Sequence, residues 1–522
     1  MLSEDQQLLL KALLCVVVLV ILIVQICSSS PRQQVLKKYV FSILAMACAI
    51  AYFDFGFLHS TSLWPLEKLP QRYVHAHENF HYRLGSKYFD ELGYDGLYLA
   101  SLAAEMGDNP QHAVQPIMRG LHDDRIVSTA ELMPYKEDVV QRFSADRWEA
   151  FLKDHQDFLK IMSAERLEKA RLDHGFNATP TWIFMGKLLS GWLPINQPSL
   201  FFLSLVDAVL MAVAFFVVYR TYGLQTLALS LAIFALGYGW RFHWTGGGYL
   251  RLDWLAALLI AICLLKQERF TWAGALIGYA AMIRLFPVLL LFGPLVLVVK
   301  SLLVTQRLPY WAWPFARGLI LSVVVCLALG ALAGRGLGAW QEFGSNIIKH
   351  QQTRLTNRVG LENLILYDAD VFQRKFVDYS LIEPFSPWKT HLENLKKERW
   401  IDYYSLAAIF LLVTAAAAWR ESVYGASVLG CVAVFSLLTP TCYYWSLLAL
   451  VPLQNTKNGA TMLLLALNLL FIGVHFLYSS SEQRFGVVSW GLAFFFLAWT
   501  LPNVLEAWRE SRSTRLPKEH TR

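Results

Sequence analysis

Runs of roughly 20 mostly apolar residues recur along most of this chain, and no other feature limits its fold so strongly. A helix of that length can cross the hydrocarbon core of a bilayer while satisfying its own backbone hydrogen bonds. Hydrophobic residues make up 56% of the 522 residues and charged residues only 16%, which argues against a string of soluble domains. The sequence therefore predicts an all-α polytopic integral membrane protein of about 13 transmembrane helices. The predicted spans are 9–27, 38–57, 198–219, 224–241, 252–266, 270–286, 287–304, 312–334, 401–419, 422–438, 441–455, 459–478 and 485–506.

The distribution of basic residues sets an orientation for these spans. Arg32, Lys37 and Lys38 place the first connection in the cytoplasm by the positive-inside rule. Alternation from that point puts a basic residue in every short cytoplasmic loop and leaves residues 59–197 and 335–400 outside. The surplus of 46 basic over 39 acidic residues is modest and local, so it indicates topology and gives no reason to expect nucleic-acid binding.

These boundaries divide the chain into six parts. They are two N-terminal transmembrane helices (1–58), a large outer helical loop (59–197), transmembrane helices (198–334), a second outer loop (335–400), transmembrane helices (401–506) and a basic cytoplasmic tail (507–522). The first apolar run is expected to be a membrane helix and not a signal peptide, because Glu4 and Asp5 precede it where basic residues would stand. The seven cysteines lie in or beside apolar runs, so neither long loop is a disulfide framework.

The large outer loop has the pattern of helices. From Ser144 onwards apolar residues recur at i, i+3, i+4 and i+7, with Ser144 or Asp146 as the expected cap. We expect this single apolar stripe to pack down on the membrane domain, because one stripe alone cannot build a soluble core. A short interfacial helix is expected between Pro180 and Pro194.

A dense cluster of ionisable and aromatic residues follows the second span, from His75 to Tyr98. Within it, His77-Glu78-Asn79-Phe80-His81 spells H-E-x-x-H, which on a helix places two imidazoles on one face to hold zinc. A zinc protease needs a third ligand, for which His112 and His122 are the candidates. A membrane zinc metalloprotease is therefore one alternative function of the protein, and a lipid or solute transporter is another. The simplest interpretation of the cluster itself is an ordinary solvated loop.

Four segments, in a fixed order, carry a resemblance to a known family. They are Glu78-x-x-x-Tyr82 with Gly93-Tyr94-Asp95-x-x-Tyr98; Arg284 ahead of Phe286-Pro287; Trp340-x-x-Phe343-x-x-Asn346-x-x-x-His350 with Asn357 and Gly360; and Thr439-Pro440-Thr441-Cys442-Tyr443-Tyr444-Trp445. Together they resemble the polytopic GT-C glycosyltransferases, in particular the polyprenyl-phosphate-mannose-dependent mannosyltransferases of glycosyltransferase family 87. The chain departs from that family at Glu78, where Asp is usual, and at the two tyrosines of the last segment, where Trp and His are usual. The first helix and the stretch 105–180 have no counterpart in it.

The resemblance implies inverting transfer of a hexose, expected to be mannose, from a polyprenyl-phosphate donor to a lipid, glycan or protein acceptor. It also implies a bacterial inner membrane with the site facing the periplasm. It names no cofactor and leaves metal dependence open. Tyr82, Asn346 and Tyr443, which belong to these motifs, are the expected substrate-binding residues, together with His81 next to Tyr82.

The chemistry of such a transfer suggests the remaining candidates. An acceptor hydroxyl needs a carboxylate or imidazole to take its proton, which makes Glu78 the first choice, His350 the second and Asp95 the third. The donor phosphate needs cations, and Arg284 interrupts an apolar run where an arginine is costly. Arg251, after three glycines, is a second candidate, since a glycine-rich turn can offer backbone N–H groups to a phosphate. The alternatives are a snorkelling Arg284 and a plain helix-to-helix turn in which Arg251 pairs with Asp253.

Overall fold

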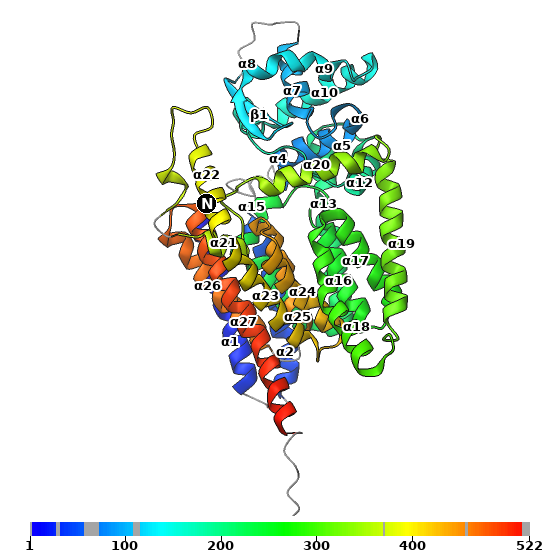
Figure 1. The fold of residues 1–522 in the computed structure, drawn as a ribbon, viewed down its shortest axis with the longest axis vertical. Coiled ribbons are helices and arrows are strands. Elements are labelled where there is room, and N and C mark those ends of the chain that lie inside the picture. The colour runs from blue at the N-terminus through cyan, green and yellow to red at the C-terminus, as the bar shows by residue number, and fades with distance from the viewer. Residues whose placement is uncertain are drawn as a thin grey trace, which may run out of the picture.

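The computed structural model describes residues 3–27, 32–56, 73–107, 115–368, 371–454 and 458–513. These residues form a long bundle of helices that is capped at one end by a smaller layer of short helices (Figure 1). In Figure 1, α20 (Gly338–Gln352) and α12 (Pro180–Ser190) lie between the bundle and the cap. The layers separate the apolar helices from the more polar first loop, as the sequence predicts.

In the described part of the chain, 7 helices are long and apolar enough to cross a membrane. They are α1 (Glu4–Cys27), α13 (Gln197–Tyr222), Phe286–Thr305, which joins η6 (Phe286–Leu291) to α18 (Phe292–Thr305), α19 (Ala312–Ala331), α23 (Trp400–Ala418), α26 (Gly459–Leu477) and the first part of α27 (Ser481–Ser513). They expose many large apolar side chains, as helices that face lipid do. The chain is therefore a mostly helical integral membrane protein.

Further helices complete the bundle. They are α2 (Arg32–Tyr52), α14 (Leu224–Leu236), α16 (Asp253–Lys266), α17 (Phe270–Arg284), α24 (Val423–Leu437) and α25 (Val451–Gln454). Nearly every residue of α16 and α24 is buried, so these helices are apolar on all sides because other helices surround them. The predicted span 441–455 begins as a 3₁₀-helix, η8 (Cys442–Leu450). The count of 13 spans stays a prediction.

The cap is built from the first loop that the sequence predicts to lie outside. Its helices are α4 (Ala76–Asn79), the π-helix η3 (Phe80–Leu84), α5 (Gly85–Lys87), α6 (Phe89–Leu92), α7 (Leu97–Met106), α8 (Thr129–Leu132), α9 (Lys136–Val140), α10 (Ala145–Ile161) and α11 (Ala164–Ala170). The predicted helix after Ser144 is confirmed as α10, and the Ser144 side chain accepts a hydrogen bond from the Arg147 N–H.

The expected packing of α10 on the membrane domain is wrong. Its apolar side chains Phe151 and Phe158 lie in a core that consists mainly of cap residues, including Phe80, Tyr88 and Tyr98, and that meets the membrane bundle at the start of α13. The cap can do this because the segment from residue 73 to 106 supplies a second apolar surface, which a single stripe in the sequence does not reveal.

The all-α prediction also misses a small hairpin. Strands β1 (Ile117–Gly120) and β2 (Arg125–Ser128) pair antiparallel, with Gly120 opposite Arg125. Two strands of four residues are too short to give a recognisable alternation in the sequence.

Candidate functional site

A buried ion pair joins the cap to the membrane bundle. Glu78 in α4 and Arg251, in the loop before α16, lie with Oε2 and Nε 2.9 Å apart. Only 3% of the Arg251 side chain and 18% of the Glu78 side chain are exposed. The alternative pairing of Arg251 with Asp253 is therefore not the one adopted, and Asp253 instead accepts a hydrogen bond of 2.9 Å from the Tyr279 hydroxyl.

The loop that carries Arg251 is fixed from both sides. The backbone N–H of Arg251 donates a hydrogen bond to the Asp207 carboxylate of α13 at 2.8 Å. Gly247 has a φ of 78°, and its carbonyl accepts hydrogen bonds from the His75 N–H and the Asn79 side chain at the start of the cap. The N–H groups of Gly246 and Gly248 donate within the turn. The glycines thus shape the turn and allow its contact with α4. Two of their three backbone N–H groups already donate hydrogen bonds inside the turn.

A tyrosine ring lies against the Arg251 guanidinium. The Arg251 guanidinium carbon lies 4.3 Å from the ring centroid of Tyr82, whose hydroxyl donates to the Asn177 side-chain oxygen at 2.6 Å. The segment η8 brings Tyr443 and Tyr444 within electrostatic range of Arg251. A cation held against aromatic faces gains from the ring quadrupoles.

Arg284, at the end of α17, is the second cation near this pair. It donates from Nη2 to the Leu250 carbonyl at 3.1 Å and acts electrostatically on Tyr82. Its Nε is buried and has no hydrogen-bond partner within the described ranges. We call Glu78, Tyr82, Arg251 and Arg284 the ion-pair centre.

Both arginines of the ion-pair centre stand next to a strained residue. Leu250 precedes Arg251 with a φ of 52°, and Leu285 follows Arg284 with a φ of 57°. A leucine in the left-handed region costs on the order of 1–3 kcal/mol and persists only where the surroundings enforce it. The strain shows that the surrounding packing holds the backbone next to both arginines in a fixed conformation.

Next to the ion-pair centre lies a group that we call the histidine centre: His77, His81 and Asp173. His77 Nε2 lies 2.8 Å from Asp173 Oδ2, and His81 contacts the His77 carbonyl at 3.0 Å and the Tyr98 hydroxyl at 2.8 Å. One potential ligand atom from each of the three side chains lies within 4.8 Å of the others. Asp173 thus stands where the third ligand that the H-E-x-x-H pattern lacks could come from. No sequence signal identified it, because it lies 96 residues after His77.

The histidine centre fits a metal ion only in part. Both ring nitrogens of the buried His81 already contact oxygen atoms, so coordination would break one of these contacts. Burial lowers the pKa of His81 to about 4, which keeps the ring neutral at physiological pH. Burial also acts to lower the pKa of His77, but the hydrogen bond and charge of Asp173 outweigh it and raise that pKa. Glu78, which would activate a metal-bound water, is paired with Arg251.

Three other candidates lie apart from the ion-pair centre. Asn346 donates to the Phe176 carbonyl at 3.2 Å and supports the segment that carries Asn177. One turn later in α20, His350 faces His174, with ring centroids 6.3 Å apart. Burial lowers the pKa of His350 to about 4. Its Nε2 is buried and has no hydrogen-bond partner among the described residues.

Asp95 lies on the cap's own surface. It is 3.6 Å from His122 and 3.7 Å from Arg142, and it lines a cavity of about 500 Å³ there. His122 is therefore a neighbour of Asp95 and lies outside the histidine centre, while His112 falls outside the described residues.

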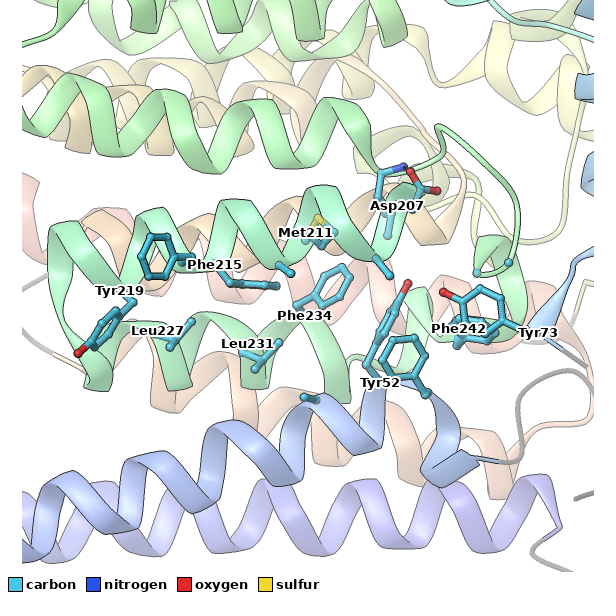
Figure 2. Close-up of a pocket in the computed structure, with 18 residues that line it drawn as sticks. Tyr52, Tyr73, Asp207, Met211, Phe215, Tyr219, Leu227, Leu231, Phe234 and Phe242 are labelled. Atoms are coloured by element: carbon cyan, nitrogen blue, oxygen red, sulfur yellow. Dashed lines mark hydrogen bonds between the residues drawn. The ribbon is translucent and has the colours of Figure 1, made fainter. Parts of the chain in front are cut away.

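An apolar pocket opens beside the loop of Arg251. It has a volume of about 390 Å³ and lies between α2, α13 and α14. Figure 2 shows Tyr219 and Leu227 at one end and Tyr52, Tyr73 and Asp207 near the other. Asp207 is the residue that binds the Arg251 N–H, so the polar end of this pocket borders the ion-pair centre.

No protein-family model, no curated protein and no solved structure matches this chain.

Proposed function

We propose that this protein is an inverting GT-C type glycosyltransferase. It transfers a hexose, with mannose the expected sugar, from a polyprenyl-phosphate donor to a lipid, glycan or protein acceptor at the outer face of a bacterial inner membrane. The observation that carries the proposal is the buried pair of Glu78 with Arg251, with Arg284 beside it, at the junction of the membrane bundle and the cap.

Arg251 and Arg284 bind the donor phosphate in this proposal. A buried cation requires an anionic partner, and Glu78 supplies one when no donor is present. The incoming phosphate takes over that role, since a planar guanidinium matches the geometry of phosphate oxygens. Glu78 is thereby released from its ion pair and becomes the general base.

The transfer then follows from these positions. The acceptor oxygen attacks the anomeric carbon of the sugar while its proton passes to Glu78. The bond from that carbon to the phosphate oxygen breaks, and its electron pair leaves on the polyprenyl phosphate. The two arginines stabilise the negative charge of the leaving group. A single displacement of this kind inverts the anomeric centre.

The apolar pocket between α2, α13 and α14 suits the first part of the donor's isoprenoid chain. Its lining is mostly aromatic and aliphatic, and its polar end borders the loop of Arg251. A donor with its phosphate on Arg251 would therefore have an apolar path available towards the lipid.

The histidine centre supports a second candidate, a membrane zinc metalloprotease. Asp173 completes a set of three possible ligands with His77 and His81. Both enzymes need the Glu78 carboxylate free, and the pairing with Arg251 disfavours the protease because only the transferase has an anionic substrate that would take over Arg251.

A transfer assay with the purified full-length protein and radiolabelled polyprenyl-phosphate mannose tests the proposal. The wild type is expected to transfer the sugar, and Glu78→Gln to lose on the order of a hundredfold to ten-thousandfold in rate. Asp173→Asn makes the same carboxylate-to-amide change at the neighbouring half-exposed pair and is expected to retain most activity. The melting midpoint of each variant is measured beside transfer, because Glu78→Gln also leaves the buried Arg251 without its partner. Equal loss in both variants would contradict the assignment of Glu78 as the base.

A further inference from the structure

A second large cavity lies at the outer end of the membrane helix α23. Its volume is about 740 Å³, and it is formed by α20, α21 (Leu361–Leu366), α22 (Ser386–Glu398) and the first turn of α23. The residues that determine its chemistry are Arg354, Glu362, Lys396, Lys397, Arg399 and Trp400. None of them belongs to the ion-pair centre or the histidine centre.

The cavity lining carries an excess of positive charge. Four basic side chains line it, against the carboxylates of Glu362 and Glu393. Arg354 and Lys396 lie 2.5 Å and 2.9 Å from the two oxygens of Glu362, so these two cations share a single negative charge and one positive charge remains uncompensated. The Nε of Arg354 is buried and lacks a hydrogen-bond partner within the described ranges. The remaining charge favours an anionic ligand.

The aromatic residues of the lining place the cavity at the membrane surface. Trp400, Tyr403 and Tyr404 stand at the start of a helix long enough to span a bilayer. Trp400 is 55% exposed and Tyr404 is 62% exposed. Tryptophan and tyrosine are concentrated at the level of lipid headgroups, so the cavity lies at that depth. Further along α23, exposed apolar side chains such as Leu412 face the lipid chains.

We infer that this cavity binds an anionic phospholipid of the surrounding bilayer. The lipid phosphate contacts Lys396, Lys397 and Arg399, and the acyl chains lie along the exposed face of α23. A soluble anion would use the basic residues but not the adjoining apolar surface, so the arrangement favours a lipid. This inference does not depend on the proposed transferase function.

Native mass spectrometry of the purified full-length protein tests this site. Phosphatidylglycerol and phosphatidylcholine with the same acyl chains are added in turn, and the wild type is expected to retain phosphatidylglycerol preferentially. The double variant Lys396→Gln/Lys397→Gln should weaken its binding by roughly fivefold to thirtyfold. The matched control, Arg374→Gln/Lys375→Gln, removes two exposed charges of the same outer loop outside the cavity and should leave binding unchanged. Equal losses in both double variants, or no preference in the wild type, would overturn the inference.

A second measurement needs no charge variant. Brominated phosphatidylglycerol should quench the fluorescence of Trp400 more than brominated phosphatidylcholine does, read as the difference between wild type and Trp400→Phe. Millimolar glycerol phosphate should not displace the lipid. Displacement would show that the cavity recognises a free phosphate, and equal quenching by both lipids would show that it does not recognise the headgroup; either result would overturn the lipid assignment.

Discussion

His77 and Glu78 are adjacent in α4, yet their side chains end in very different surroundings. Glu78 pairs with an arginine that is only 3% exposed, whereas His77 and its partner Asp173 are 33% and 45% exposed. The first pair links the cap to the membrane bundle, and the second lies within the cap. A buried ion pair is costly to break, while a half-exposed pair contributes little, so neighbouring residues here have very different energetic weight.

Removal of the buried cation should have the largest effect on stability. Arg251→Met leaves Glu78 without its partner, which should cost about 3–5 kcal/mol. The double variant Glu78→Gln/Arg251→Met should recover much of that loss, because neither charge is then left unpaired. A thiol-reactive dye can follow thermal unfolding, since most of the free cysteines are buried. If the double variant were as unstable as Arg251→Met, the unpaired charge of Glu78 would not be the cause of the lost stability.

The second arginine should affect donor binding more than folding. Arg284→Ala removes a charged hydrogen-bond donor from the proposed phosphate site, worth about 1.5–3 kcal/mol, or roughly tenfold to 150-fold in affinity. Equilibrium binding of polyprenyl-phosphate mannose to the purified protein measures this. Arg317→Ala is the control, because Arg317 contacts Thr271 at 3.4 Å in an exposed position. An unchanged donor affinity in Arg284→Ala would favour a purely structural role.

The apolar pocket should discriminate between donors by chain length. Met211→Trp adds bulk to its lining and should weaken a long-chain donor several-fold more than a short-chain analogue that does not reach the pocket. Competition binding with the two donors gives the ratio. An equal effect on both would place the donor chain elsewhere.

The histidine centre should give the smallest effect, and one that depends on pH. Burial opposes a charge on His77, but Asp173 outweighs it and raises the His77 pKa above the ordinary value of about 6.5. The pair's stabilisation is therefore complete below that value and is lost as the pH rises through the raised pKa. Because both groups are partly exposed, the contribution should stay below about 1 kcal/mol. The difference in melting midpoint between wild type and Asp173→Asn should thus shrink from pH 6 to pH 9; a constant difference would contradict this assignment.

The apolar runs of the sequence predict the outer helices of the bundle closely. The expected spans 287–304 and 401–419 correspond to the helical segments Phe286–Thr305 and Trp400–Ala418. Lipid imposes this agreement, since a spanning helix must be both long and apolar. The start of the expected span 441–455 is a 3₁₀-helix instead, because buried neighbours and not lipid determine its shape.

The candidate site could be predicted only where local sequence carries it. Glu78 and Tyr82 are only four residues apart, so one short motif contains both. Arg284 can be recognised from the sequence as a candidate site residue, because an arginine in an apolar run is costly. Asp173 could not be found in this way, because it reaches His77 only through the packing of α11 and the following loop. Asp95 and His350 belong to suggestive motifs, but neither contacts the ion-pair centre among the described residues.

One paired measurement tests the central claim most directly: sugar transfer and zinc content, determined on the same preparations of wild type, Glu78→Gln and Asp173→Asn. Our account predicts transfer of mannose by the wild type and by Asp173→Asn, loss of transfer in Glu78→Gln, and no tightly bound zinc needed for activity. No sugar transfer by the wild type, together with one zinc per chain that is lost in Asp173→Asn, would contradict the glycosyltransferase proposal and support the protease.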